Sequence, residues 1–317
     1  MNRNLLPLSA VLLVAFAASA RAANFELEKN DDGYTVKLDG KLLTRYVIKS
    51  GPKPIFWPVI GTNGNEVTRA YPMREGNPDE RKDHIHHRSF WFTHGNVNGV
   101  DFWAETGKNG DIVHREFTKA QGGETAVIAT RNDWLGPDGK KHCEDERTFT
   151  FGSDGQRWWV DCDIVVKASD GPCTFGDTKE GSFGVRVAGT MKVDAKKGGQ
   201  IVNSEGQTDG AAWAQPASWV DYHGPVEGKT EGIAILNHPS SFRHPTTWHV
   251  RTYGLFCANP FGLRDFKQTN ADGTPANGAH TIPKGESMNL RYRVLFHSGD
   301  EKEGKVAESY AEYAKMK

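Results

Sequence analysis

The sequence predicts an all-β fold, a large antiparallel β-sandwich that ends in one short helix. Three observations support this prediction. Most periodic segments alternate apolar and polar residues with the two-residue period of a strand. Glycine, asparagine, aspartate and proline interrupt these segments at short intervals. Strands do not alternate with helical patterns, so antiparallel sheets packed as a sandwich are favoured over a parallel sheet.

The predicted strands are short and follow one another along the chain. Residues 25–29, 34–38 and 42–48 form the first three, and Asp39-Gly40 joins the last two as a hairpin. The later predicted strands cover residues 88–94, 112–119, 124–132, 144–151, 157–167, 184–191, 232–237, 248–253 and 290–296. Ser153-Asp154-Gly155 predicts a second hairpin turn.

One helix is predicted over residues 302–316, where Val306, Tyr310 and Tyr313 fall on one side at helical spacing. Long irregular stretches occupy residues 62–82, 196–223 and 260–283. Loops of this length in a compact domain are usually functional, so we expect them to contribute to a site.

The N-terminus has the pattern of a secretory signal peptide over residues 1–22. Arg3 supplies the positive start, residues 5–18 the apolar run, and Ala20-Arg21-Ala22 a small-x-small cleavage pattern. We therefore expect a periplasmic or secreted protein, with residues 23–317 forming a single β-sandwich domain.

Composition limits the partners of the chain. Lysine and arginine number 39 against 40 for aspartate and glutamate, so no broad basic field favours nucleic acid. After the signal, no stretch approaches the ~20 apolar residues of a membrane span. The four cysteines, Cys143, Cys162, Cys173 and Cys257, allow three disulfide pairings, but buried thiols suit a chain of this size equally, and we predict no bridge. The oligomeric state is left open.

The segment 83–103 is the strongest candidate for a site. It places four of the twelve histidines, His84, His86, His87 and His94, within eleven residues and among aromatic side chains. If the segment enters a strand, His84 and His86 share a face and His87 points away. Neutral imidazoles bind metals and move protons near neutral pH, so the cluster suits a metal or a sugar. The alternative is that these histidines only hydrogen-bond the backbone of a loop.

A second candidate is the segment 178–186, in which Glu180 precedes a predicted strand that contains Arg186. Glu180 is the leading acid or base, and its pKa depends on burial and on the distance to Arg186. The alternative is a Glu180–Arg186 surface ion pair, which would contribute little.

A third candidate is the segment 221–259, which is rich in aromatic residues and His-Pro steps. Its predicted substrate-binding residues are Tyr222, His238, Arg243, His244, Trp248 and Asn259, together with Arg88, His94 and Arg186 from the first two segments. The aromatic rings offer flat apolar faces, and the amide and guanidinium groups offer donors for hydroxyls or carboxylates. The alternative for the aromatic residues is a place in the core.

Three long motifs resemble a known family. They are Asp83-His84-x-His86-His87-Arg88-Ser89 with His94-Gly95-x-Val97-Asn98-Gly99-Val100-Asp101-Phe102-Trp103, then Lys179-Glu180-Gly181-Ser182-Phe183-Gly184, and His238-Pro239 through His244-Pro245-x-x-Trp248-His249-Val250-Arg251 with Ala258-Asn259-Pro260-Phe261-Gly262. These motifs closely resemble secreted bacterial proteins labelled "methane oxygenase PmoA-like". Membrane methane monooxygenase subunits cross the bilayer several times, whereas no such span is predicted here, so the label itself is not followed. The family is otherwise one of unknown function, commonly met among sugar-processing genes, and the resemblance therefore implies a carbohydrate context.

A resemblance in architecture is to the galactose-mutarotase type of supersandwich, which aldose epimerases and several glycan lyases and hydrolases share. This resemblance implies that a histidine acts as acid and a glutamate as base beside the sugar ring. His86 or His87 and Glu180 would then take these catalytic roles.

We therefore predict a secreted carbohydrate-active enzyme that uses His86, His87 and Glu180 for acid-base catalysis, by glycosidic bond cleavage or by a rearrangement such as epimerisation. Paired-carboxylate hydrolysis would add Asp101 or Asp221. No cofactor is expected. The first alternative is a divalent-metal enzyme in which His84, His86 and a distant third histidine bind zinc, copper or iron. The second is a non-catalytic carbohydrate-binding protein.

Overall fold

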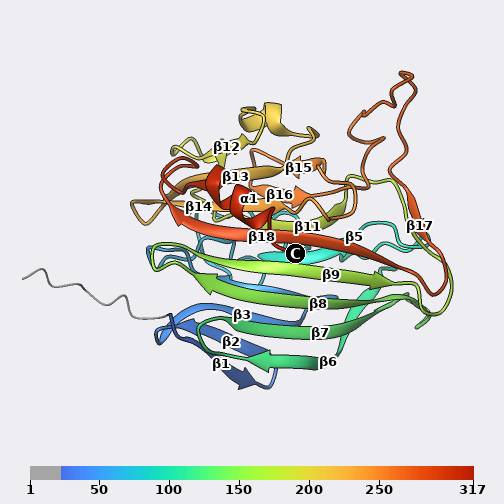
Figure 1. Ribbon diagram of the computed structural model, residues 1–317, viewed down its shortest axis with the longest axis horizontal. Coiled ribbons are helices and arrows are strands. Elements are labelled where there is room, and N and C mark those ends of the chain that lie inside the picture. The colour runs from blue at the N-terminus through green and yellow to red at the C-terminus, as the bar shows by residue number, and fades with distance from the viewer. Residues whose placement is uncertain (1–22) are drawn as a thin grey trace, which may run out of the picture.

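The structure is a computed structural model that describes residues 23–317, and the expected signal peptide at residues 1–22 lies outside the described residues. Two eight-stranded antiparallel sheets face each other, and one short helix lies against the second sheet (Figure 1). The prediction of a large antiparallel β-sandwich with a short C-terminal helix is confirmed.

The first sheet has the strand order β1-β2-β3-β4-β5-β11-β16-β15. Its strands are β1 (Phe25–Asn30), β2 (Gly33–Leu38), β3 (Lys41–Ser50), β4 (Lys53–Val59), β5 (Phe90–His94), β11 (Gly181–Arg186), β16 (Leu255–Ala258) and β15 (Trp248–Val250). The last four strands come from three distant parts of the chain and lie side by side. This half of the sheet therefore brings the three candidate segments together.

The second sheet has the strand order β12-β13-β14-β18-β9-β8-β7-β6. Its strands are β12 (Gln200–Asn203), β13 (Trp219–Val226), β14 (Lys229–Asn237), β18 (Ser287–Ser298), β9 (Trp158–Lys167), β8 (Lys141–Ser153), β7 (Ala126–Leu135) and β6 (Asp111–Gln121). A two-stranded sheet pairs β10 (Cys173–Phe175) with β17 (His280–Ile282). Two 3₁₀ turns, η1 (Val193–Ala195) and η2 (Asp209–Ala212), precede and follow β12.

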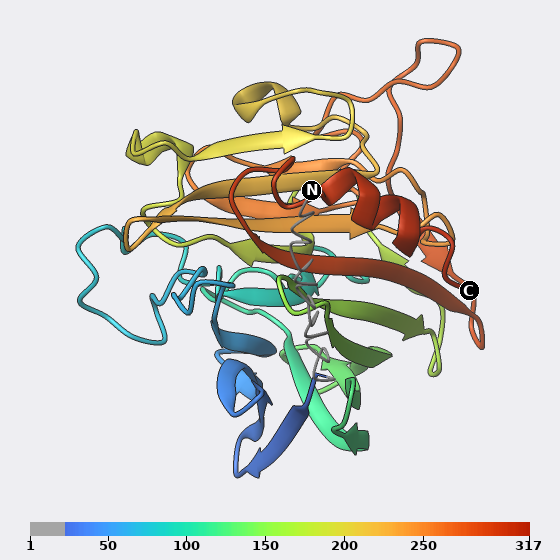
Figure 2. The same ribbon diagram turned by 60° about the vertical axis from the view of Figure 1, so that its left-hand side comes forward.

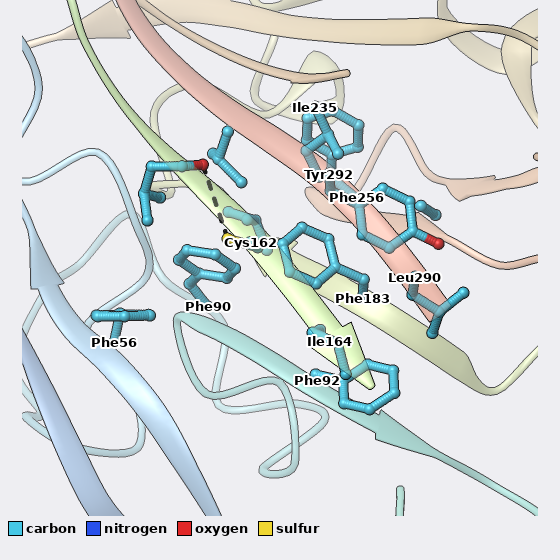
Figure 3. Packing of buried hydrophobic residues seen from close by; sticks show 14 of the residues in the cluster. Phe56, Phe90, Phe92, Cys162, Ile164, Phe183, Ile235, Phe256, Leu290 and Tyr292 are labelled. Carbon is cyan, nitrogen blue, oxygen red and sulfur yellow. Dashed lines mark hydrogen bonds between the residues drawn. The ribbon is translucent and has the colours of Figure 1, made fainter. Parts of the chain in front are cut away.

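The main core fills the space between the two sheets. Alternate residues of each strand point inward, as the two-residue period requires. Figure 3 shows Phe90 and Phe183 of the first sheet beside Cys162, Leu290 and Tyr292 of the second. The rings of Phe183 and Tyr292 stack with their centroids 4.6 Å apart, so aromatic packing joins the sheets near the candidate segments.

A second, smaller apolar cluster lies on the outer face of the first sheet. It contains Val47, Ile55, Trp91, Trp103, Leu255 and Cys257. Trp91 stands between the core residues Phe90 and Phe92, so its side chain points away from the main core. This cluster is the base on which the candidate site is built.

The C-terminal helix α1 (Val306–Tyr313) is shorter than predicted and lies next to β18 (Figures 1 and 2). Val306 and Tyr313 are buried, and Tyr310 packs beside them against Leu236 of β14 and Leu295 of β18. The predicted apolar side of the helix is confirmed, and it covers the outer face of the second sheet.

The predicted hairpins at Asp39-Gly40 and 153–155 are both confirmed. The prediction of an irregular stretch at 196–223 is confirmed for residues 204–218 and wrong for residues 200–203 and 219–223, which belong to β12 and β13. Periodicity did not reveal β12 because it is only four residues long, and it did not reveal β13 because Gly224-Pro225 interrupts its pattern. The stretch 260–283 is mainly a loop that extends away from the sheets (Figure 2).

All four cysteines are buried with free thiols. Within residues 23–317, no helix is long and apolar enough to cross a membrane.

Candidate functional site

The histidines at 84–87 lie in a turn that precedes β5, not in a strand, so the expectation that His87 points away from His84 is wrong. His84 has a positive φ of 43°, and the His87 amide donates to the His84 carbonyl over 2.9 Å. The two rings stack with centroids 4.8 Å apart and planes 5° apart, and His86 meets His87 edge-on at 4.5 Å. A turn therefore gathers all three imidazoles.

A cavity of about 320 Å³ lies on the outer face of the first sheet, beside these histidines. One wall is formed by His84, His86 and His87. Two other parts of the chain also line the cavity: the segment before β11 and the segment from β15 to Tyr253. The three candidate segments thus meet at one cavity, as a ligand site built from distant polar groups requires.

Six of the eight remaining cavity residues come in three pairs. Asp101 and Trp103 follow β5, Lys179 and Glu180 precede β11, and His249 and Arg251 belong to β15 and the residue after it. Ala104 and Tyr253 complete the lining. His249 stands between the core residues Trp248 and Val250, so strand alternation directs it to the outer face.

The hydrogen bonding of His87 fixes its tautomer. Nη1 of Arg186 lies 2.8 Å from Nδ1 of His87, and a guanidinium can only donate, so Nδ1 accepts and the proton of the neutral ring is on Nε2. Nε2 of His87 is buried and has no partner among the described residues. Burial and the charge of Arg186 hold the pKa of His87 well below its usual value. His87 therefore presents an unused N–H donor and stays neutral at neutral pH.

His249 has the same arrangement. Nε1 of Trp213 donates to Nδ1 of His249 over 3.1 Å, which again leaves the ring proton on Nε2. Burial, with the charge of Arg251, lowers the pKa of His249 to about 3. Two of the cavity imidazoles, His87 and His249, are thus neutral, and hydrogen bonds from Arg186 and Trp213 set their tautomers.

Two ion clusters, whose arginine and lysine side chains are at most 13% exposed, lie near the histidines. In the Asp83 cluster, Oδ1 of Asp83 accepts from Nη1 of Arg69 at 2.8 Å and from Nη2 of Arg186 at 3.2 Å. In the Glu105 cluster, the carboxylate accepts from Lys53 at 2.9 Å and from Arg88 at 2.7 Å. Each cluster holds two cations and one carboxylate.

These clusters explain the pKa values near the cavity. Burial and the charges of Lys53 and His84 lower the pKa of His86 to about 4. Burial lowers the pKa of Lys53 to about 8, although Glu105 opposes this effect. Protonation of His86, His87 and His249 is therefore disfavoured by desolvation and by neighbouring positive charges.

Glu180 is held in place by its backbone, while its carboxylate remains accessible. The Glu180 carbonyl accepts from the Gly95 amide at 2.7 Å, and Nδ2 of Asn259 donates to the Lys179 carbonyl at 3.1 Å. The side chain is 38% exposed and pairs with Lys179 at 3.3 Å. A glycine follows because a Cβ at Gly181 would lie 2.4 Å from Nδ1 of His94. The expected Glu180–Arg186 surface pair is wrong, since Arg186 is buried and pairs with Asp83.

Asp101 shapes the aromatic wall. Its Oδ1 accepts from the amides of Trp103 at 2.7 Å and Ala104 at 3.1 Å, which closes a turn and fixes the backbone of Trp103. The Trp103 ring lies 5.5 Å from both Trp91 and His87. Trp103 and Tyr253 therefore offer apolar faces beside polar groups.

Several residues predicted to bind substrate lie behind the cavity instead. Arg186 and Arg88 belong to the two ion clusters, and Asn259 supports the turn before Glu180. His94 is buried, with Nε2 donating to the Gly176 carbonyl at 2.8 Å and Nδ1 next to Ser182 at 3.2 Å. These contacts position the cavity wall.

Other predicted residues lie away from the cavity. Tyr222 and Trp248 are fully buried between the sheets, and their polar atoms bond backbone groups. Arg243 donates to the carbonyls of Pro260, Gly278 and Ala279. His238 bonds Met316, and His244 bonds Tyr310, so both pack near α1. Of the third candidate segment, 221–259, only His249, Arg251 and Tyr253 line the cavity.

A comparison with protein families gives one match, to the family of unknown function DUF6807, over residues 33–311. The chain belongs to this family. The matching description differs from the PmoA-like label that the motifs led us to expect. No curated protein matches the sequence of the DUF6807 protein.

The solved structures that match the DUF6807 protein have low sequence identity to it and TM-scores below 0.5. The alpha-galactosidase from Lactobacillus brevis shares 7% identity at a TM-score of 0.42, over 88% of this chain and 40% of that chain. A beta-arabinopyranosidase shares 10% sequence identity at a TM-score of 0.36, and the match covers 88% of this chain and 38% of that chain. The chain thus spans less than half the length of these two. A galactose mutarotase-like protein from Lactobacillus casei ATCC 334 shares 9% sequence identity at a TM-score of 0.37, and the match covers 86% of this chain and 100% of that chain.

The expected metal pair His84 and His86 has ring centroids 5.7 Å apart. Among residues 23–317, three ligand atoms of His, Cys, Asp or Glu lie within 4.8 Å of one another only at Asp221, His223 and Glu301. Asp221 stands between the core residues Val220 and Tyr222, so it faces the outer side of the second sheet. Asp221 is therefore on the other side of the sandwich from the cavity, and it is not a second carboxylate for Glu180.

Lys179, Trp103, His249 and Arg251 belong to the candidate segments but are not among the predicted catalytic and substrate-binding residues. Alternation around Trp248 could have revealed His249, because a core Trp248 implies an outward His249. The contribution of Arg251 depends on the turn after β15, which periodicity does not reveal.

Proposed function

We propose that the DUF6807 protein is a carbohydrate-active enzyme that moves a proton on a sugar bound in this cavity. The reaction would be cleavage of a glycosidic bond or a rearrangement such as epimerisation. One observation supports the proposal above others. Glu180 and His87, whose buried Nε2–H has no partner among the described residues, line the same cavity, beside Trp103 and Tyr253.

Glu180 acts as the base in this proposal. Its carboxylate is accessible from solvent and lines the cavity, so it can accept a proton from the sugar. The role of His87 differs from that expected from the sequence. Because its neutral form is strongly favoured, it acts as a hydrogen-bond donor through Nε2 and stabilises negative charge that develops on a sugar oxygen.

His86 and Asp101 are the further candidates for proton transfer. His86 is half-buried in the cavity wall, and its low pKa makes it a weak base rather than an acid near neutral pH. Asp101 is the second carboxylate of the cavity, and its Oδ1 already accepts two backbone amides. Paired-carboxylate hydrolysis would use Glu180 and Asp101.

The size of the cavity limits the substrate. A volume of about 320 Å³ is at the small end of the range for small-molecule sites, roughly 300–1,000 Å³. We propose that one or two sugar units are bound, outside the cytoplasm, without a metal cofactor.

The test is an activity screen of purified protein against glycosides, free sugars and keto-sugars, with and without chelator. The proposal expects turnover that chelator leaves unchanged and that Glu180→Gln lowers while binding persists. Binding without turnover of any sugar would favour the carbohydrate-binding alternative. Activity lost on chelation would favour the metal alternative.

A further inference from the structure

The basic groups around the cavity are not balanced by the carboxylates that bond them. The Asp83 cluster and the Glu105 cluster each hold two cations on one carboxylate. Two further carboxylates line the cavity: Asp101, which accepts from the amides of Trp103 and Ala104, and Glu180, which pairs with Lys179. Counted with the two clusters, Lys179 and Arg251, the cavity has six basic groups and four carboxylates. Positive potential at the floor of a cavity attracts anions.

Arg251 adds a guanidinium that forms no ion pair with an acidic residue in 23–317. Its side chain lines the cavity and forms no hydrogen bond or ion pair with any other residue in 23–317. The guanidinium lies 5.6 Å from the ring centroid of Trp213 and 5.5 Å from that of Tyr253. Two aromatic rings thus hold it in place while its five donors stay free for a ligand.

Two more donors at the cavity have no partner. Nε2 of His87 and Nε1 of Trp103 are both buried, and both residues are at most 2% exposed. A buried N–H without an acceptor costs about 1–3 kcal/mol, so such groups mark places where a ligand supplies the acceptor. Neither group can accept a hydrogen bond in its present form.

We infer that the ligand of this cavity carries a carboxylate, as a uronic or aldonic acid does, and that Arg251 is its partner. The guanidinium fork matches a carboxylate, and the N–H groups of His87 and Trp103 supply donors for neighbouring oxygens. The sugar part of the ligand rests on the proposed function, whereas the carboxylate part rests on the charges and donors described above.

Calorimetric titration with matched pairs tests this inference: D-glucuronate against D-glucose, and D-galacturonate against D-galactose. Because hydrogen bonds to charged groups are strong, we expect the uronate that binds more tightly of the two to bind roughly 10- to 100-fold more tightly than its matched neutral sugar. Equal or tighter binding of the neutral sugars would overturn the inference and leave the proposed function standing. Tighter binding of glucose 6-sulfate than of either uronate would also overturn the choice of carboxylate.

Arg251→Gln should reduce the preference for the acid by about 10-fold or more, with neutral sugars affected little. Arg251→Lys keeps the charge without the fork and should retain part of the preference. The matched control is Arg115→Gln, which removes an exposed arginine of β6 on the second sheet and should leave the preference unchanged. Thermal melting checks that each variant is folded. An unchanged preference in folded Arg251→Gln would overturn the assignment of Arg251.

An open-chain carboxylate separates the two proposals. If D-gluconate or acetate binds in an Arg251-dependent way while no ring sugar binds or reacts, the carboxylate inference stands and the sugar proposal fails. If none of these acids binds to the wild type, the carboxylate inference is overturned.

Discussion

Nδ1 of His87 accepts a hydrogen bond from Nη1 of Arg186 over 2.8 Å. Arg186 is itself held by Asp83, so the orientation of the imidazole is set by a buried ion pair. The contact leaves Nδ1 without a proton and Nε2 with one. It also opposes protonation, because the added charge would lie beside a guanidinium. His87 is thereby suited to donate a hydrogen bond rather than to release a proton.

Two replacements of His87 test whether it donates a hydrogen bond or transfers a proton. We expect His87→Ala to lower kcat by ~10²–10³-fold, the usual cost of losing one donor to a developing oxyanion. His87→Gln keeps an N–H group and should retain much more activity. Steady-state kinetics with the substrate from the screen measures both. Equal losses in the two variants would show that the imidazole transfers a proton.

Glu180→Gln should lower kcat by ~10²–10⁴-fold and change ligand affinity little, because the amide keeps the shape of the side chain but accepts no proton. The matched control is Glu286→Gln, an exposed glutamate beside β18 that should retain full activity. Wild-type kcat in folded Glu180→Gln would remove Glu180 from the mechanism.

Much of this architecture follows from local sequence patterns. The hairpin at Asp39-Gly40 and the apolar side of α1 depend on turn chemistry and periodicity, and both were predictable. The turn at His84 was not, because its positive φ and the contact of Arg69 with the His84 carbonyl come from tertiary structure. Arg243 shows a related problem: a guanidinium predicted to bind substrate instead satisfies loop carbonyls.

Neutral buried histidines also predict how stability depends on pH. The folded-state pKa of His94 is about 4 because of burial, below its unfolded value, so the unfolded state binds the proton first as pH falls. The stabilisation is complete above about pH 6.5 and is lost toward pH 4, on the order of 3 kcal/mol over the full range. Urea unfolding at pH 7 and pH 4.5 should show a smaller difference for His94→Gln than for the wild type. An identical difference in both proteins would contradict the assignment.

Asp221 is predicted to act in stability and not in catalysis. Its carboxylate is fully buried and accepts from Nδ1 of His223 at 2.7 Å and from Nε2 of His297 at 2.8 Å. Asp221→Asn should lower the free energy of unfolding by about 3–5 kcal/mol, as breaking a buried pair does, while ligand affinity stays unchanged.

The control is Asp163→Asn, which removes a carboxylate that is 41% exposed and pairs with Arg291. Its expected cost is below about 1 kcal/mol. Similar destabilisation by both variants would refute the structural role of the Asp221 network.

Export is a separate prediction from the N-terminal sequence. We expect the mature protein to begin at or near Ala23, because the charged start, apolar run and small-residue pattern occur in the required order. N-terminal sequencing of protein recovered from the periplasm or the medium checks this. A chain that still begins with Met1 would contradict it.

The most direct test is a crystal structure of the protein with the sugar that the activity screen identifies. We predict that the sugar lies in the cavity, with one oxygen about 2.7–3.2 Å from Nε2 of His87 and with the Glu180 carboxylate next to the reacting atoms. A sugar bound elsewhere on the molecule, with Nε2 of His87 still unpartnered, would contradict the account.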